Sequence, residues 1–210
     1  MKQWWAVPGE IGAVPELRDV RVPTPGFGEV LVRMAGAGVN RGELMFNRLL
    51  RIDNPKARAV RSGIEIAGVI ETLGDGVDGW SLGDRVMARG SACHAEAALV
   101  DAGALMPSPV WLSNVDAAAI PNVFVTAHAA IVTVAGVTAG DTVLITAGSS
   151  GVGTAAIQIV KHLGATAIAT TRSSAKAAAL VDLGADHVVD TSSPDWLSSM
   201  VDQIGSVTCV

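Results

Sequence analysis

Tyrosine is absent from this chain of 210 residues, cysteine occurs twice, and aromatic residues make up only 4% of it. Without tyrosine, the chain has no phenolic hydroxyl to serve as a general acid. Cys93 and Cys209 are far apart and form no CxxC pair, so neither a disulfide framework nor a four-cysteine zinc lobe can be built. A reducing compartment suits this composition best.

Positive charge is also scarce, because the formal net charge is −5 at pH 7. This balance argues against a broad nucleic-acid surface. A local basic run is interpreted as a solvated loop, and it consists of Arg48, Arg51, Lys56, Arg58 and Arg61. The first eight residues lack the long apolar core of a signal peptide, so a cytoplasmic location is expected.

Charge is missing altogether from residues 117–140, a stretch long enough to span a bilayer. Pro121, Asn122, Thr126 and His128 would make a poor lipid-facing helix, however. We therefore predict a buried segment between two domains and no membrane span.

Residues 1–118 show short strand-like runs broken by turns. Residues 29–34 and 64–71 alternate as strands do, whereas residues 23–28 and 74–79 carry the proline and glycine of turns. This half is predicted to be a β-rich barrel.

Residues 119–210 change rhythm and alternate strand with helix. The elements expected are residues 142–146, 152–163, 166–171, 174–183 and 187–190. Gly164 and Gly184 each follow a helix, where a left-handed residue closes the last turn. The alternation predicts a parallel sheet with right-handed crossovers.

A further helix is expected to begin with Ser193 as N-cap and Pro194 at its first position, and to end near Gly205. Residues 206–210 then read as the start of a fourth parallel strand. A dinucleotide site of this type uses two mononucleotide-binding halves, and only the first is expected here.

The most informative motif is a glycine turn between a buried strand and a helix. In the pattern G-x-G-x-x-G, Gly148 and Gly153 fill the outer places and Ser150 takes the middle one. A helix start offers unpaired N–H groups and a positive dipole end, which together hold a pyrophosphate. The predicted cofactor-binding residues of this turn are Ala147, Gly148, Ser149, Ser150, Gly151, Val152 and Gly153.

The second strand indicates which dinucleotide binds. No Asp or Glu occurs from residue 142 to residue 181, so the usual acidic partner of the NAD ribose is missing. Thr170, Thr171, Arg172 and Lys176 offer hydroxyls and cations that suit a 2′-phosphate. We predict that NADPH binds more tightly than NADH; the alternative is that Arg172 and Lys176 are merely solvated residues at a helix start.

Taken together, the motifs resemble one family over nearly the whole chain, up to about residue 190. They are PTPGFGEVLV at residues 23–32, GVN at 38–40, IEIAGV at 64–69, GDRV at 83–86, and the turn from residue 147 with AAIQ at 155–158. The chain resembles the medium-chain dehydrogenase/reductases, and within them the zinc-independent quinone oxidoreductase and zeta-crystallin branch. The resemblance implies an α/β protein with a GroES-like β-rich barrel (1–118) and a partial Rossmann domain (119–210).

The resemblance also bears on metal. Where zinc-dependent relatives carry ligands, this chain has Asn40, Ile64 and Asn122, and Ile64 cannot coordinate a metal. Glu43, Glu65 and His94 are other donors, but a site built from them would need a new arrangement. We expect no metal; a zinc-type alcohol dehydrogenase relative is a further alternative.

Without a metal, the expected reaction is hydride transfer from NADPH to a quinone or an α,β-unsaturated carbonyl, including an enoyl thioester. The resemblance places Asn40 near nicotinamide and substrate, where its amide can donate to the acceptor carbonyl, and it places Thr126 against the cofactor. Each also has a plainer reading, Asn40 as a turn residue and Thr126 as a helix hydroxyl bonded to its own backbone. Thr191 replaces a tyrosine that packs near the phosphate in relatives.

The position of the glycine turn near the chain end suggests a second hypothesis. Only 57 residues follow Gly153, which implies a C-terminally truncated member in which NADPH binding is favoured over turnover. Such a chain would be a catalytically impaired NADPH-binding or interaction protein, or an aggregation-prone fragment with an exposed sheet edge. The resemblance implies that relatives often dimerise through the missing edge, so a homodimer is possible in the full-length family and no oligomeric state is assigned to this chain.

Overall fold

A computed structural model describes residues 1–210, apart from the side chains of residues 46 and 47. The chain forms two compact units, Met1–Asn122 and Val123–Val210, whereas the sequence predicts a division after residue 118. Each unit has its own core.

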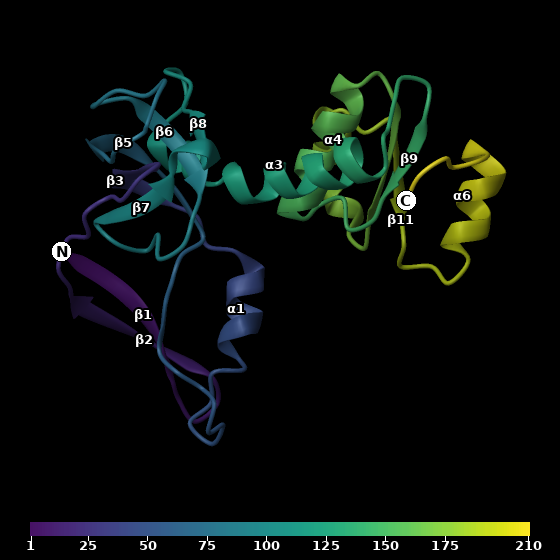
Figure 1. Ribbon diagram of the computed structural model, residues 1–210. Helices are drawn as coiled ribbons and strands as arrows, with labels where there is room; N and C mark the ends of the chain where they lie inside the picture. Colours follow the sequence, from purple (N-terminus) through teal and green to yellow (C-terminus); the bar gives the residue numbers. More distant parts are fainter. The chain divides into compact units, whose positions relative to one another are not determined.

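The main sheet of the first unit has five antiparallel strands in the order β7-β3-β5-β6-β8 (Figure 1). Their bounds are β3 Glu29–Ala37, β5 Glu65–Leu73, β6 Arg85–Arg89, β7 Ala97–Asp101 and β8 Leu105–Pro107. The register between β3 and β5 shifts twice, at Leu31/Val32 and at Met34/Gly36. Such irregularities bend a strand and increase its twist, which curls the sheet around its buried side chains.

A smaller antiparallel sheet, in the order β2-β1-β4, completes the strands of this unit. It consists of β1 Lys2–Pro8, β2 Ala13–Asp19 and β4 Val60–Arg61, and the unit also contains α1 Arg41–Asn47, the 3₁₀ turn η1 Ala102–Ala104 and α2 Asn114–Ala118. The basic run is exposed throughout, and within it Arg51 pairs with Asp53 at 2.7 Å.

The second unit contains a parallel sheet in the order β11-β10-β9. Its elements after residue 140 are β9 Thr142–Ile145, α4 Gly151–His162, β10 Thr166–Thr171, η3 Ser174–Lys176, α5 Ala177–Asp182, β11 His187–Asp190 and α6 Trp196–Ile204. Cys209 forms a parallel bridge with Val143 on the free side of β9, where the sequence predicts a fourth strand. The predicted alternation and the mixed α/β fold class are confirmed.

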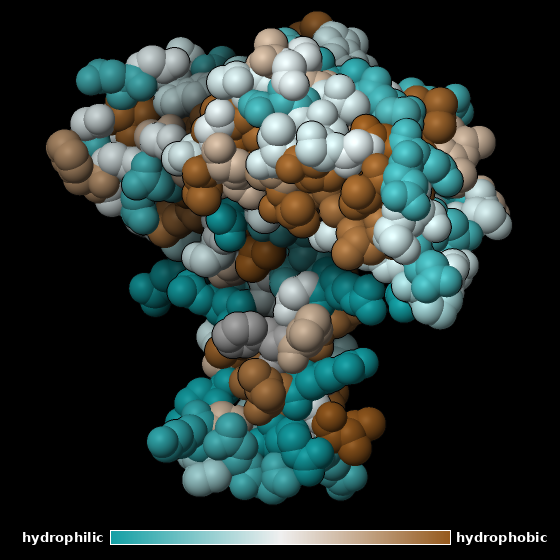
Figure 2. All heavy atoms as spheres, turned by 90° about the vertical axis from the view of Figure 1, so that its right-hand side faces the viewer, coloured by the Kyte–Doolittle hydropathy of each residue, from teal (hydrophilic) through white to brown (hydrophobic). Residues whose placement is uncertain are grey.

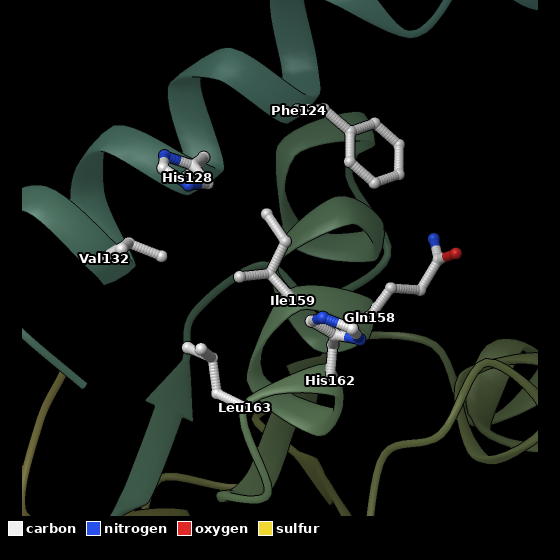
Figure 3. Close-up of a pocket in the computed structure, with 7 residues that line it drawn as sticks. All are labelled: Phe124, His128, Val132, Gln158, Ile159, His162 and Leu163. Carbon is white, nitrogen blue, oxygen red and sulfur yellow. The ribbon is translucent and has the colours of Figure 1, made fainter. Parts of the chain in front are cut away.

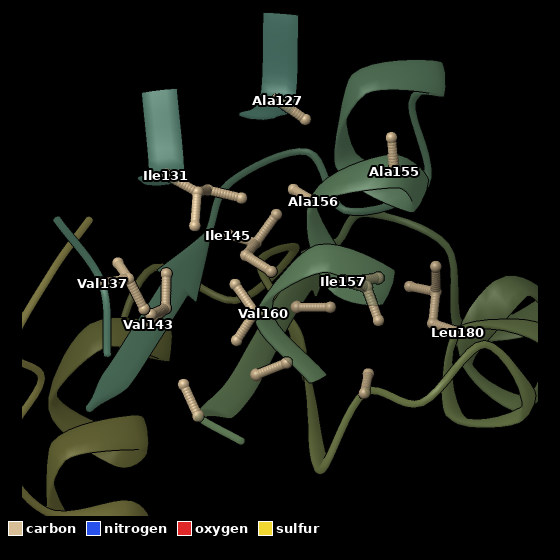
Figure 4. Packing of buried hydrophobic residues seen from close by; sticks show 14 residues of the cluster. Ala127, Ile131, Val137, Val143, Ile145, Ala155, Ala156, Ile157, Val160 and Leu180 are labelled. Carbon is tan, nitrogen blue, oxygen red and sulfur yellow. The ribbon is translucent and has the colours of Figure 1, made fainter. Parts of the chain in front are cut away.

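The core of this unit lies between the sheet and the helices (Figure 4). Ile157 and Val160 of α4 are fully buried, and they pack with Ile145 of β9 and Leu180 of α5. Gln158 and Lys161 on the same helix are exposed. Because buried residues recur at helical spacing, one face of α4 covers the sheet and the other meets solvent.

The helix ends confirm two predictions and correct two others. Gly164 and Gly184 have φ values of 78° and 107°, in the left-handed region predicted for them. The helix predicted at 174–183 is divided into η3 and α5, and α6 begins at Trp196 rather than at Pro194. The later start of α6 has a local cause, because Ser193 Oγ accepts from the Asp195 N–H at 3.4 Å and stabilises a turn before the helix.

The uncharged segment predicted to be buried is in fact half exposed. It contains α3 Pro121–His128 and a π-helical turn, η2 Ala129–Val134, in which Ala127 and Ile131 are buried. Val134 is 84% exposed, since its side chain points away from that buried stripe. No helix among the described residues is long and apolar enough to cross a bilayer. On the face of the molecule drawn in Figure 2, hydrophobic residues form patches between hydrophilic ones.

Candidate active site and cofactor turn

Three side chains that are distant in sequence meet in the first unit. The Asn40 amide nitrogen Nδ2 donates to Glu65 Oε1 at 2.6 Å, and Asn40 Oδ1 accepts from Asn122 Nδ2 at 2.8 Å. The other carboxylate oxygen, Glu65 Oε2, accepts from the backbone N–H of Asn122 at 2.8 Å. We call Asn40, Glu65 and Asn122 the amide–carboxylate cluster.

The cluster forms at the ends of three elements. Asn40 lies in the loop between β3 and α1, Glu65 begins β5, and Asn122 is the second residue of α3. Gly38 makes room for the carboxylate, because a Cβ at this position would overlap Glu65 Oε1 and Cδ. Glycine is therefore required beside the buried carboxylate.

A second layer of polar groups fixes the loop that carries Asn40. Glu43 Oε2 accepts from the Asn40 backbone N–H at 2.9 Å, and Glu43 Oε1 accepts from the Gly63 N–H at 3.2 Å. The His94 ring contacts Gly38 O at 2.9 Å through Nε2. Burial, with the charges of Glu43 and Glu65 as lesser causes, raises the pKa of the Cys93 thiol to about 12. Cys93 therefore stays a protonated thiol rather than a nucleophilic thiolate at neutral pH.

The donors that the sequence offers for a metal are engaged with protein groups. Glu43, Glu65 and His94 all make the hydrogen bonds given above, and the part of the chain that the structure describes contains no group of three His, Cys, Asp or Glu able to hold a metal ion. Zinc independence stays a prediction.

The glycine turn of the second unit is held by the strand beside it. The Gly148 N–H donates to Thr170 O at 2.8 Å, and the Ala147 N–H donates to Thr170 Oγ1 at 3.1 Å. Ala147 has φ +51°, a left-handed conformation that is unusual for alanine. At the helix start, Gly153 packs so closely on Ala147 and Gly148 that no side chain fits there.

Ser150 has a structural role that the motif comparison missed. Its Oγ accepts from the Gly153 N–H at 3.1 Å, and its backbone is extended, so Ser150 is the N-cap of α4. The serine that departs from the middle glycine of the motif thus satisfies one of the unpaired N–H groups of the helix. A serine directly before a helical pattern is the sequence signal that indicates this role.

Replacement of Ser150 tests the cap. Ser150→Ala should lower the free energy of unfolding by about 1 kcal/mol, because the cap acceptor is lost, while Ser150→Gly should cost only a few tenths. Chemical denaturation measures both. Equal losses in the two variants would contradict the capping role.

The end of β10 carries the other predicted cofactor residues. Thr170 and Thr171 are buried, while Arg172 and Lys176 are exposed. Thr171 lies opposite Asp190 of β11 in the parallel register. Asp190 cannot be recognised from the sequence of the second strand, because only the register between β10 and β11 brings it to this edge.

The Asp190 carboxyl is ionised at this edge. Its Oδ1 accepts from the Ser192 N–H at 2.9 Å, and hydrogen bonds from Ser192 lower its pKa. Thr191 donates its N–H to Thr171 O at 2.9 Å. An anion therefore accompanies the two cations of this edge.

The structure groups the predicted residues in two sets. Asn40 lies in the amide–carboxylate cluster of the first unit, and the predicted cofactor residues gather at the carboxyl ends of β9 and β10 and the adjoining turns in the second. Thr126 lies on α3, also in the second unit, and is exposed. Parallel sheets bind ligands at this carboxyl edge.

The second unit also has a shallow, mostly apolar hollow of about 310 Å³ between α3, η2 and α4 (Figure 3). It is lined by Phe124, His128, Val132, Gln158, Ile159, His162 and Leu163. None of the residues predicted to bind the cofactor or to catalyse lines it. The hollow is therefore separate from both sets.

Several known proteins are similar to this chain. A family model described as zinc-binding dehydrogenase matches residues 151–210. The chain is 37% identical to the spectinabilin polyketide synthase system protein NorB of Streptomyces orinoci over 88% of its own length, but it spans only 8% of that protein. Activities of such longer proteins do not transfer directly to this chain.

Solved structures match over almost the whole chain. The CurK enoyl reductase has a TM-score of 0.84 at 26% identity, with 96% of this chain and 63% of that one covered. A mycobacterial protein solved with NADPH, Rv1454c, has a TM-score of 0.82 at 30% identity, with 96% and 63% covered. An NAD-dependent alcohol dehydrogenase has a TM-score of 0.84 at 32% identity, with 98% and 68% covered. The chain belongs to the medium-chain dehydrogenase/reductase superfamily of oxidoreductases, and of the three solved structures named here one is complexed with NADPH and another is described as NAD-dependent.

Proposed function

We propose that this chain reduces a conjugated carbonyl, either a quinone or an α,β-unsaturated carbonyl such as an enoyl thioester, with NADPH and without zinc. The observation that carries this proposal is the amide–carboxylate cluster. It sets the amides of Asn40 and Asn122 at two of the positions where the family resemblance places metal ligands, and it holds them with the buried carboxylate of Glu65, which adjoins the third position, Ile64. Amides bind and polarise a carbonyl by hydrogen bonding, so the chemistry favours an acceptor that needs no Lewis acid.

NADPH, when bound, supplies the hydride. The protein must then stabilise the negative charge that develops on the acceptor oxygen as the hydride arrives. One N–H of Asn40 Nδ2 bonds Glu65, and the second is the donor that we assign to the acceptor carbonyl. Because Asn40 is held at both ends of its amide, this donor is oriented before the substrate binds.

The preference for NADPH is supported by the charges at the end of β10. The N–H groups at the start of α4 suit the pyrophosphate, and Arg172 and Lys176 suit the 2′-phosphate. Asp190 opposes a phosphate there, but it is one anion against two cations. The two cations outweigh this single anion, so we expect the 2′-phosphate to raise the affinity for NADPH above that for NADH.

Two assays of the 210-residue chain test the proposal. Fluorescence titration should give a lower dissociation constant for NADPH than for NADH. NADPH oxidation should then depend on a quinone or enone and should survive dialysis against a chelator. A preference for NADH would refute the cofactor assignment, loss of the rate with chelator would indicate a zinc-type enzyme, and binding without oxidation of any acceptor would indicate an NADPH-binding protein.

A further inference from the structure

Glu65 is a buried carboxylate whose hydrogen-bond partners are not cations. Glu65 is only 2% exposed, and its two carboxylate oxygens accept hydrogen bonds from the Asn40 side chain and the Asn122 backbone. Placing a carboxylate in such a site is costly compared with an apolar residue of similar size. The proposed hydride transfer gives it no direct task, so its contacts need another explanation.

The contacts of Glu65 dictate which way the neighbouring amides face. The backbone N–H of Asn122 cannot turn round, so it requires an acceptor, and Glu65 Oε2 supplies it. The other carboxylate oxygen, Oε1, is also an acceptor in the structure, and its donor is Asn40 Nδ2. Asn40 must therefore present Nδ2 to Glu65, and its Oδ1 must face the Asn122 amide. An amide without such a partner can face either way, because its oxygen and nitrogen are nearly equal in shape.

We infer that Glu65 is a positioning residue that fixes the direction of the Asn40 amide, and so the side on which Asn40 offers its second N–H to the acceptor carbonyl. The assignment of the acceptor rests on the proposed function. The direction of the amide rests only on the hydrogen bonds of the cluster.

Glu65→Gln reverses this direction while keeping the shape of the side chain. In this variant the Asn122 N–H donates to the Gln side-chain oxygen, so the Gln NH₂ group faces Asn40. Asn40 must then turn its Oδ1 toward position 65, which moves its Nδ2 to the opposite side. Loss of one oriented donor should lower kcat about 10- to 100-fold. The dissociation constant of NADPH should change less than about twofold, since the predicted phosphate contacts lie in the other unit.

A double-mutant cycle on kcat asks whether Glu65 acts through Asn40. Asn40→Ala, Glu65→Gln and the double variant are assayed with the same acceptor. The double variant should be no slower than Asn40→Ala alone. If the fold-losses of kcat in the two single variants multiply in the double variant, Glu65 acts independently of Asn40 and the inference is overturned. Glu71→Gln is the matched control, because it makes the same substitution at an exposed position of the same strand and should leave kcat unchanged.

A second cycle, on thermal stability, needs no turnover. Asn40→Asp alone sets two carboxylates face to face and should lower Tm by several degrees. In the Glu65→Gln background, the carboxylate introduced at position 40 accepts from both neighbours, so the double variant should recover most of that loss while kcat stays low. An equal effect of Asn40→Asp in both backgrounds would overturn the inference. If no acceptor supports turnover by the original chain, yet this coupling is found, the proposed function fails and the positioning role stands.

Discussion

Gly153→Val is expected to destabilise the second unit by about 3 kcal/mol and to weaken NADPH binding at least tenfold. A Cβ at Gly153 would lie 2.5 Å from Ala147 O and 2.7 Å from the Gly148 Cα. Both are backbone atoms of the glycine turn, so the strain cannot be relieved by a side-chain rotation. The turn must move away from the helix start, and the N–H groups that are predicted to bind the pyrophosphate move with it.

The control for this variant is Gly42→Val in α1, where a Cβ meets nothing within 4 Å. It should change stability by less than about 1 kcal/mol, because valine is at least as good a helix former as glycine. Chemical denaturation and NADPH fluorescence measure both variants. An unchanged NADPH affinity in a destabilised Gly153→Val chain would show that the pyrophosphate does not bind at this turn.

The parts of the fold that the sequence predicts well are those specified by neighbouring residues. The strand, glycine turn and helix around residues 142–163 follow from local pattern, and Gly164 and Gly184 mark the ends of α4 and α5 because glycine adopts a positive φ without a steric clash. The bounds of β10 and β11 are also as predicted. Ser150 belongs to this local class too, but comparison with a motif hid its capping role.

The amide–carboxylate cluster depends on contacts across the chain. Asn40 and Glu65 are 25 residues apart, and Asn40 and Asn122 are 82 apart. The sequence singles out all three residues, yet it cannot show that the Asn122 backbone fixes one end of the carboxylate and Asn40 the other. Asp190 was missed for a similar reason, because its place beside Thr171 is set by strand register.

Amino-acid composition also does not predict which side of a helix is buried. The uncharged segment at residues 117–140 has apolar residues on every side of its helix, so composition predicts burial for all of them. The unit to which α3 belongs buries one stripe, containing Ala127 and Ile131, and leaves Val125 and Val134 exposed. Which stripe is buried depends on the packing partner rather than on the segment itself.

Arg172→Gln is expected to weaken NADPH binding about 10- to 100-fold and to leave NADH binding unchanged. Hydrogen bonds to a charged group contribute about 1.5 to 3 kcal/mol, and only NADPH has the 2′-phosphate that would receive them. Fluorescence titration of both cofactors gives the ratio directly. The effect should exceed that of a general change in charge, because Arg172 follows directly on the end of β10.

Lys161→Gln separates these two explanations. It removes the same charge from the same unit, but Lys161 lies in the last turn of α4, where it pairs with Asp186 at 2.8 Å, and not at the glycine turn where that helix begins. The ratio of the two dissociation constants should therefore stay as in the original chain. If Lys161→Gln and Arg172→Gln lower NADPH affinity equally, the preference comes from the overall charge of the unit. If only Arg172→Gln does so, the 2′-phosphate binds where the second strand ends, at an edge that Arg172 and Lys176 make cationic despite Asp190.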